Sequence, residues 1–288
     1  MIITHDVDQA ISLTLAPDPA PLWRFQYGRT PKPHFQSLRT PAGYELALVE
    51  PYDHIWHRGL WFAIKFVNGE NFWEEREPFG IQKVSTTPQV TIDNGGVRID
   101  LSLDWIGPDG DSPIAEQRRI TWRPGNGTYA LDWSSRLTAN RDLTLDRTPY
   151  TTWGGYGGLS FRGTRTWHIE RYMLPSREEA PLTPGYRAPW CDLSGKFDGG
   201  IDLTGGIAMF DRPDETGQST PWYGGGNPAM NFFNAAFLFD GPMDVASGQD
   251  LDFSYRVVVH DGIWNQDQAE SAYRTWIDEQ GTITETGQ

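Results

Sequence analysis

Titratable and aromatic side chains gather in one short segment, Asp53-His54-Ile55-Trp56-His57-Arg58-Gly59-Leu60-Trp61-Phe62. A buried imidazole or guanidinium must find a hydrogen-bonding partner or cost stability, so a purely structural segment rarely carries this mixture. On an extended strand, His54 and His57 would lie about 10 Å apart on opposite faces. Pro51 and Gly59 flank them and favour a turn, which would let the two rings converge. We therefore expect this segment to form the floor of a functional site.

The two imidazoles of this segment could transfer protons near neutral pH. We take His54 and His57 as a candidate catalytic acid/base pair. Arg58 is the candidate anchor for a substrate hydroxyl or carboxylate, because a guanidinium binds oxygen-rich groups. Two structural histidines that are hydrogen-bonded to the backbone are the alternative interpretation.

Aromatic rings elsewhere in the chain could complete a binding pocket. The chain has 13 tryptophans, 31 glycines and 21 prolines, which is typical of proteins that stack indoles on sugar rings and equally of a large β core. A glutamate held against an indole, as Glu75 is near Trp73, can have a raised pKa and act as an acid or base, and a solvated acidic loop is the alternative. The candidate substrate-binding residues are Trp61, Trp73, Glu75, Trp153, Tyr156, Arg162, Trp222 and His260.

The sequence leaves metal binding open. His54 and His57 form a His-x-x-His pair, and a third ligand would have to come from His260 or a glutamate. The chain has no His-Glu-x-x-His motif, no cysteine cluster and no calcium loop. It also lacks the Gly-x-Ser-x-Gly motif and phosphate-binding glycine loops, which excludes P-loop kinases and Rossmann dehydrogenases. We expect no cofactor, with a divalent metal as the alternative.

Composition limits the partners and the compartment. The net charge of −14 over 288 residues argues against nucleic acid or an anionic membrane as a partner. One cysteine, Cys191, allows no internal disulfide bond. No apolar run reaches the roughly 18–20 residues of a membrane span, and the first residues lack the pattern of a signal peptide. We expect a cytoplasmic protein whose partner is a small sugar or glycoside, and a homo-oligomer stays open.

The elements that must position these residues are mostly β-strands. Apolar and polar residues alternate within short segments, which indicates β-strands, and these strands recur at a spacing of roughly 8–12 residues. The pattern predicts a single-domain β-sandwich or supersandwich over 1–288. Residues 175–200 are expected to form a long loop, and 264–280 one C-terminal helix that ends at Gly281. The expected strands are 11–15, 22–27, 44–49, 60–66, 89–92, 97–103, 116–122, 129–133, 205–210, 232–239 and 252–260.

Five motifs, in this order, resemble those of a bacterial family tagged PmoA ("methane oxygenase"). They are Arg39-Thr40-Pro41-Ala42-Gly43, Asp53-His54-x-x-His57-Arg58-Gly59-Leu60-Trp61-Phe62, Asn68-Gly69-x-x-Phe72-Trp73, Tyr156-Gly157-Gly158-Leu159-x-x-Arg162 and Tyr255-Arg256-Val257-Val258-Val259-His260-Asp261-Gly262. The resemblance implies a galactose-mutarotase-like β-supersandwich and a place in bacterial sugar catabolism. Methane oxidation is not expected, because the enzyme behind that tag lies in a membrane.

The family's motif reads Asp-His-Pro-His-His-Arg-Gly, and this chain departs from it at two positions. Ile55 and Trp56 replace the proline and the middle histidine. The departure argues against any role that needs three histidines, and it adds an indole to the site.

The residues and the resemblance together predict an enzyme that acts on a sugar or glycoside by proton transfer. Epimerisation, β-elimination and hydrolysis all fit that chemistry. The alternative is a non-catalytic carbohydrate-binding or accessory protein that uses the same pocket. A structural interaction domain would leave the histidines and Arg58 without a role.

Overall fold

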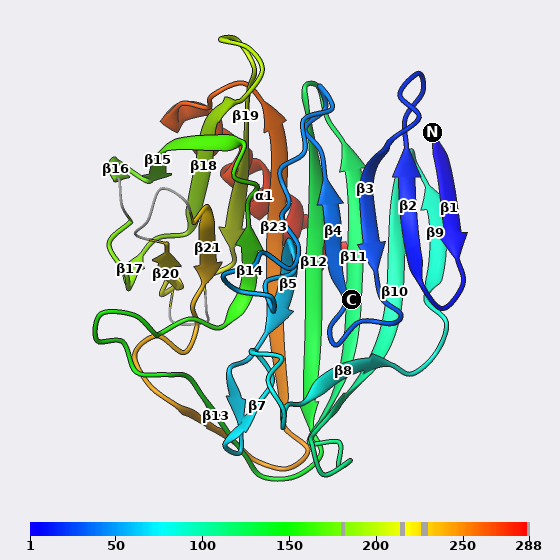
Figure 1. The fold of residues 1–288 in the computed structure, drawn as a ribbon, viewed down its shortest axis with the longest axis vertical. Coiled ribbons are helices and arrows are strands. Elements are labelled where there is room, and N and C mark those ends of the chain that lie inside the picture. Colours follow the sequence, from blue (N-terminus) through cyan, green and yellow to red (C-terminus); the bar gives the residue numbers. More distant parts are fainter. Residues whose placement is uncertain (180–181, 214–216, 226–229, 287–288) are drawn as a thin grey trace.

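The computed structural model describes residues 1–179, 182–213, 217–225 and 230–286, and within them it is nearly all β with one helix, α1 (Gln266–Thr286) (Figure 1). The predicted fold class, all-β with one C-terminal helix, is confirmed. No helix in the described ranges combines the length and apolarity needed to cross a bilayer.

One antiparallel sheet carries the candidate site. Among the described residues it has nine strands, in the order β1 (Ile2–Asp6), β2 (Ala10–Thr14), β3 (Pro21–Gln26), β4 (His34–Leu38), β5 (Leu60–Ala63), β14 (Gly158–Arg162), β21 (Phe232–Ala235), β20 (Pro221–Gly224) and β17 (Tyr186–Arg187).

A larger sheet packs against the first one, and a small sheet lies at one end of the molecule (Figure 1). As far as the chain is described, the larger sheet has ten strands: β16 (Arg177–Glu179), β15 (Trp167–Leu174), β18 (Trp190–Phe197), β19 (Thr204–Asp211), β23 (Asp250–Asp261), β12 (Thr128–Ala139), β11 (Ile114–Pro124), β10 (Gly96–Ile106) and β8 (Ile81–Val84), with β9 (Gln89–Asp93) also paired to β10. The small sheet joins β22 (Met243–Val245), β13 (Leu143–Asp146), β6 (Phe66–Val67) and β7 (Glu70–Asn71).

The main core lies between the two large sheets. Strand β10 shows why, because its residues alternate strictly between buried and partly exposed, which places Leu101, Leu103 and Trp105 on the inner face. Helix α1 covers the other face of the ten-stranded sheet, where Trp276 packs on Phe210 with ring centroids 6.2 Å apart. The helix therefore closes a second apolar layer and leaves the nine-stranded sheet uncovered by helix.

Five expectations about the elements are wrong. The expected strand 60–66 is divided between β5 and β6, and the expected strand 232–239 ends at Ala235. Residues 44–49 form only isolated bridges, because their backbone pairs with single residues of several neighbours: the Leu46 N–H donates to the Leu38 carbonyl oxygen and the Leu48 N–H to the Arg162 carbonyl oxygen. Residues 175–200 hold β16, β17 and β18, and β18 is an internal strand despite its glycine, since Gly195 allows the backbone of His168 to approach closely. Helix α1 continues through Gly281, which costs only about 1 kcal/mol relative to alanine.

A buried ion pair links the two large sheets. Arg118 and Glu116 have no exposed side-chain surface, and Arg118 Nε donates to Glu116 Oε1 at 2.7 Å. Arg118 Nη2 also donates to Gln82 Oε1 at 3.1 Å, and Gln82 Nε2 donates to the Phe62 carbonyl oxygen at 2.8 Å. The interior of the larger sheet thereby holds strand β5 of the other sheet in place.

We expect the substitution Glu116→Ala to lower the free energy of unfolding by about 3–5 kcal/mol, because it leaves the Arg118 cation buried and unpaired. Urea unfolding measures this change. The control Glu170→Gln breaks an ion pair with Lys196 that is about half exposed, and it should cost under about 1 kcal/mol. Equal losses in the two variants would contradict the assignment.

Candidate active site

A pocket of about 490 Å³ lies on the outer face of the nine-stranded sheet. Successive residues of a strand point to opposite faces, so Phe62 enters the core while Trp61 and Ala63 join an aromatic cluster outside it. The residues that line the pocket are His54, Trp56, His57, Lys65, Asn71, Trp73, Glu74, Arg76, Trp153, Tyr156, Tyr223, Met230 and Phe232.

His54 and His57 lie in a turn, and the turn brings their side chains together. The His54 N–H donates to the Pro51 carbonyl oxygen at 3.0 Å, and the His57 N–H donates to the His54 carbonyl oxygen at 2.9 Å. The imidazole rings then stack with centroids 4.7 Å apart and an angle of 22° between their planes. Gly59 brings the chain back to the sheet at φ +69°, where a Cβ atom would lie 2.2 Å from the Phe35 carbonyl oxygen.

His54 is oriented by its neighbour Asp53. The His54 Nδ1–H group donates to Asp53 Oδ2 at 3.1 Å, which leaves the lone pair of the neutral ring on Nε2. Burial raises the pKa of Asp53, but hydrogen bonds from Arg162 and His54 outweigh it and hold that pKa well below its usual range. The His54 side chain is 32% exposed and lines the pocket. An ionised carboxylate that orients a solvent-accessible imidazole is the arrangement of a general base.

His57 is neutral and buried beneath His54. Burial lowers its pKa well below the usual value, and the charges of Arg162 and Lys32 and the nearby His54 lower it further. Arg162 Nη1 donates to His57 Nδ1 at 3.3 Å, so the ring proton lies on Nε2. Its ring also stacks on Phe232 at 5.0 Å. His57 can therefore donate a hydrogen bond from Nε2 but is not a cation near neutral pH.

A second polar cluster faces the same pocket. Lys65 Nζ donates to the Glu74 carboxylate and to the Tyr156 hydroxyl, the latter at 3.1 Å. Tyr156 donates in turn to Glu74 Oε1 at 3.1 Å, while the buried Glu74 Oε2 has no hydrogen-bond partner among the described residues. Burial lowers the pKa of Lys65 and raises that of Tyr156. One oxygen of Glu74 thus lacks a protein partner, and the Tyr156 hydroxyl stays protonated.

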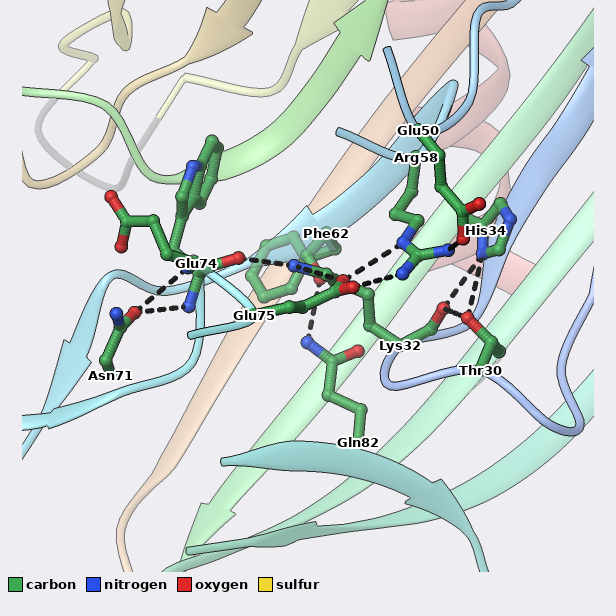
Figure 2. Close-up of polar contacts among 11 residues, drawn as sticks. Thr30, Lys32, His34, Glu50, Arg58, Phe62, Asn71, Glu74, Glu75 and Gln82 are labelled. Carbon is green, nitrogen blue, oxygen red and sulfur yellow. Dashed lines mark hydrogen bonds and ion pairs between the residues drawn. The ribbon is translucent and has the colours of Figure 1, made fainter. Parts of the chain in front are cut away.

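Arg58 and Glu75 lie behind the pocket and not in its lining. Arg58 Nε donates to Glu75 Oε1 at 3.0 Å, and its other nitrogens bind Glu75 and Glu50. Lys32 Nζ lies 3.3 Å from Glu75 Oε1 and donates to the Trp73 carbonyl oxygen at 2.6 Å. Figure 2 shows the Glu75 side chain directed at Arg58 and Lys32, with the Glu74 side chain on the opposite side.

The other predicted site residues divide into three groups. Trp73, Tyr156 and Trp153 line the pocket, and Trp153 is 55% exposed at its rim. Trp61 and Arg162 are fully buried beneath the pocket, in contact with His57.

Trp222 and His260 lie away from the pocket. Trp222 is buried in the main core, because its position on β20 points inward and its neighbour Tyr223 points outward. His260 is fully buried on the outer face of the ten-stranded sheet, where its Nε2 lies 2.9 Å from Asp192 Oδ1 and its ring stacks on Trp264 at 4.1 Å.

Sequence reasoning missed several pocket residues for which a signal exists. Lys65 is a charged residue inside the apolar run 60–67, and β5 ends at Ala63, just before it. Glu74 and Glu75 are adjacent in an irregular segment, so the sequence could not tell which carboxylate faces the pocket. The residues missed are Lys65, Asn71, Arg76, Tyr223, Met230 and Phe232.

The described residues contain no group of three or more His, Cys, Asp or Glu side chains suited to hold a metal ion. His260, the expected third ligand, is bound to Asp192 and does not line the pocket. Glu74 also lines the pocket, and its carboxylate is paired with Lys65.

The chain belongs to a family of unknown function (DUF6807), whose profile matches residues 12–274. No curated protein matches the sequence significantly.

Solved structures with a similar fold have low sequence identity. A heparan sulfate lyase mutant from Pedobacter heparinus matches 92% of this chain and 37% of its own length, with 8% identity and a TM-score of 0.47. A galactose mutarotase related enzyme from Lactobacillus acidophilus matches 83% of this chain and 94% of its own, with 8% identity and a TM-score of 0.41. A galactose mutarotase-like protein from Lactobacillus casei ATCC 334 matches 87% and 100%, with 11% identity and a TM-score of 0.38. Likeness at this level carries no functional argument.

We expect the stability of the protein to fall on acidification through buried neutral histidines. Burial lowers the pKa of His34 to about 4, and its Nδ1–H group donates to the Lys32 carbonyl oxygen at 2.9 Å. The unfolded chain binds this proton first, near pH 6.5, so the free energy of unfolding decreases between pH 6.5 and 4 by up to about 3 kcal/mol.

Urea unfolding of the wild type and of His34→Gln at pH 7.5 and pH 4.5 measures this contribution. The variant should lose part of the pH dependence, whereas His168→Gln, a change at an exposed histidine, should keep all of it. A wild-type slope retained in His34→Gln would refute the assignment.

Proposed function

We propose that this member of the DUF6807 family binds a sugar or glycoside in the pocket and transfers a proton at a ring or anomeric carbon. The reaction class is epimerisation, β-elimination or hydrolysis. The observation that carries the proposal is the Asp53–His54 pair at the edge of a pocket walled by indole and phenol rings. Flat aromatic walls suit the apolar face of a sugar, and the imidazole supplies the base.

Each side chain has a separate role in the proposed proton transfer. His54 Nε2 takes the proton, and Asp53 holds the ring in the required tautomer. His57 donates a hydrogen bond from Nε2, and the Glu74 carboxylate is the acceptor for a substrate hydroxyl. The rings of Trp73 and the other aromatic lining residues bind the sugar face.

Arg58 and Glu75 take a positioning role in this proposal instead of touching the substrate. Arg58 binds Glu75, and Lys32 binds both Glu75 and the Trp73 carbonyl oxygen. These contacts hold the chain between Trp73 and Glu75, which is the wall that carries the Glu74 carboxylate.

A non-catalytic carbohydrate-binding protein is the second candidate. The Lys65 ammonium, the Glu74 carboxylate and the Tyr156 hydroxyl are bound to one another, which suits a fixed recognition surface as well as a reacting one. Both candidates share a small sugar or glycoside as ligand, in bacterial sugar catabolism as the motif resemblance implies. A cytoplasmic location belongs to the same proposal.

We expect His54→Gln to abolish turnover while it leaves sugar affinity within about three-fold, because the amide cannot accept and return a proton. A screen of epimerase, lyase and hydrolase substrates identifies the turnover, and calorimetry measures the affinity. His168→Gln is the matched control and should retain full activity. If the wild type binds sugars but converts none, the binding protein is the correct interpretation.

We expect Trp153→Ala to weaken sugar binding about 5–10-fold with little change in stability, because this indole is 55% exposed at the pocket rim. Calorimetry and urea unfolding measure the two effects. Tyr52→Ala removes an aromatic ring that is 87% exposed and lies outside the pocket lining, so it should leave affinity unchanged. Equal losses in both variants would show that the rim indole does not bind the ligand.

A further inference from the structure

Arg76 lines the pocket and has no carboxylate partner among the described residues. Its guanidinium carbon lies 4.7 Å from the centroid of the Trp56 ring. Stacking on an indole restrains an exposed arginine, so the cation is held over the pocket while its N–H donors stay free.

The neighbouring arginines are all neutralised. Those beside the pocket that bind at least one carboxylate are Arg58, Arg162 and Arg165. The chain has an excess of 14 acidic over basic residues, so a cation left without a carboxylate here is unusual. Arg76 therefore differs from these arginines in having its charge available to a ligand.

The charges that line the pocket leave a positive excess. Lys65 and Glu74 form an ion pair and cancel each other. The Arg76 charge remains, and a local positive charge in a cleft attracts an anionic ligand.

We propose that the substrate is an acidic sugar whose carboxylate binds Arg76. This inference rests on the proposed function of the pocket and specifies its substrate class. Trp56 lies between the anion site and the base, since its ring is stacked under Arg76 and meets the His54 ring edge-on at 5.4 Å. A carboxylate on Arg76 brings the carbon next to it towards His54.

The carbon next to the substrate carboxylate can lose a proton to His54 while Arg76 binds the carboxylate. His54 Nε2 takes the proton, the C–H electron pair moves into the carboxylate group, and Arg76 stabilises the added negative charge. A proton delivered from solvent water to the opposite face of the carbon then inverts it, and His54 releases the abstracted proton to solvent. Alternatively, the electron pair forms a C=C bond and expels the oxygen substituent of the next carbon, which takes the proton back from His54 and leaves as an alcohol.

Calorimetric titration with matched pairs of probes tests the proposal, using D-glucuronate against D-glucose and D-galacturonate against D-galactose. We expect at least one uronate to bind about ten-fold or more tightly than its neutral partner at low salt. Arg76→Ala should abolish that preference, and Arg76→Lys should keep part of it. The control Arg29→Ala removes an exposed arginine outside this pocket and should keep the full preference.

Each outcome decides between the two proposals. Equal affinity within both pairs, or a uronate preference that survives in Arg76→Ala, overturns the acidic-sugar inference and leaves the sugar pocket standing. The absence of saturable binding by all four probes overturns the acidic-sugar inference and counts against the sugar pocket as well.

Discussion

The pocket depends on the buried ion pairs of the Glu75 carboxylate with Arg58 and Lys32. These three residues come from separate segments: Lys32 precedes β4, Arg58 precedes β5, and Glu75 follows β7. Breaking a buried pair leaves an uncompensated charge, so the three segments cannot move apart cheaply. The same contacts fix Trp73 and Glu74, which form one wall of the pocket. The arginine that the sequence places beside two histidines thus stabilises the site from behind.

The other constraint is the alternation of side chains along each strand. On β20 the inward position places Trp222 in the core, and the outward position places Tyr223 in the pocket. On β5 the same alternation places Phe62 in the core and Trp61 in the cluster outside it. A shift of one residue in register would exchange the two sets, so the hydrophobic core selects which rings are available to a ligand.

The sequence predicted the β architecture and the C-terminal helix because periodicity reports burial directly. It also predicted the convergence of His54 and His57, since proline and glycine at the ends of the segment favour a turn. It could not assign Glu74 and Glu75 to their sides of the wall, because both lie in an irregular segment with no period. The prediction that His260 lines the pocket was wrong for another reason. A histidine near the end of a strand can face either side of its sheet, and this one faces the side that α1 covers.

The pocket and the main core are on opposite faces of the same sheet, separated by a single thickness of backbone. A change of ring size in the pocket opens or fills space next to solvent, whereas the same change between the sheets would create a cavity that costs several kcal/mol. Ligand preference and folding stability are thereby encoded by alternate positions of the same strands. Substitutions at the pocket positions can therefore change which ligand binds, while the residues of the main core stay the same.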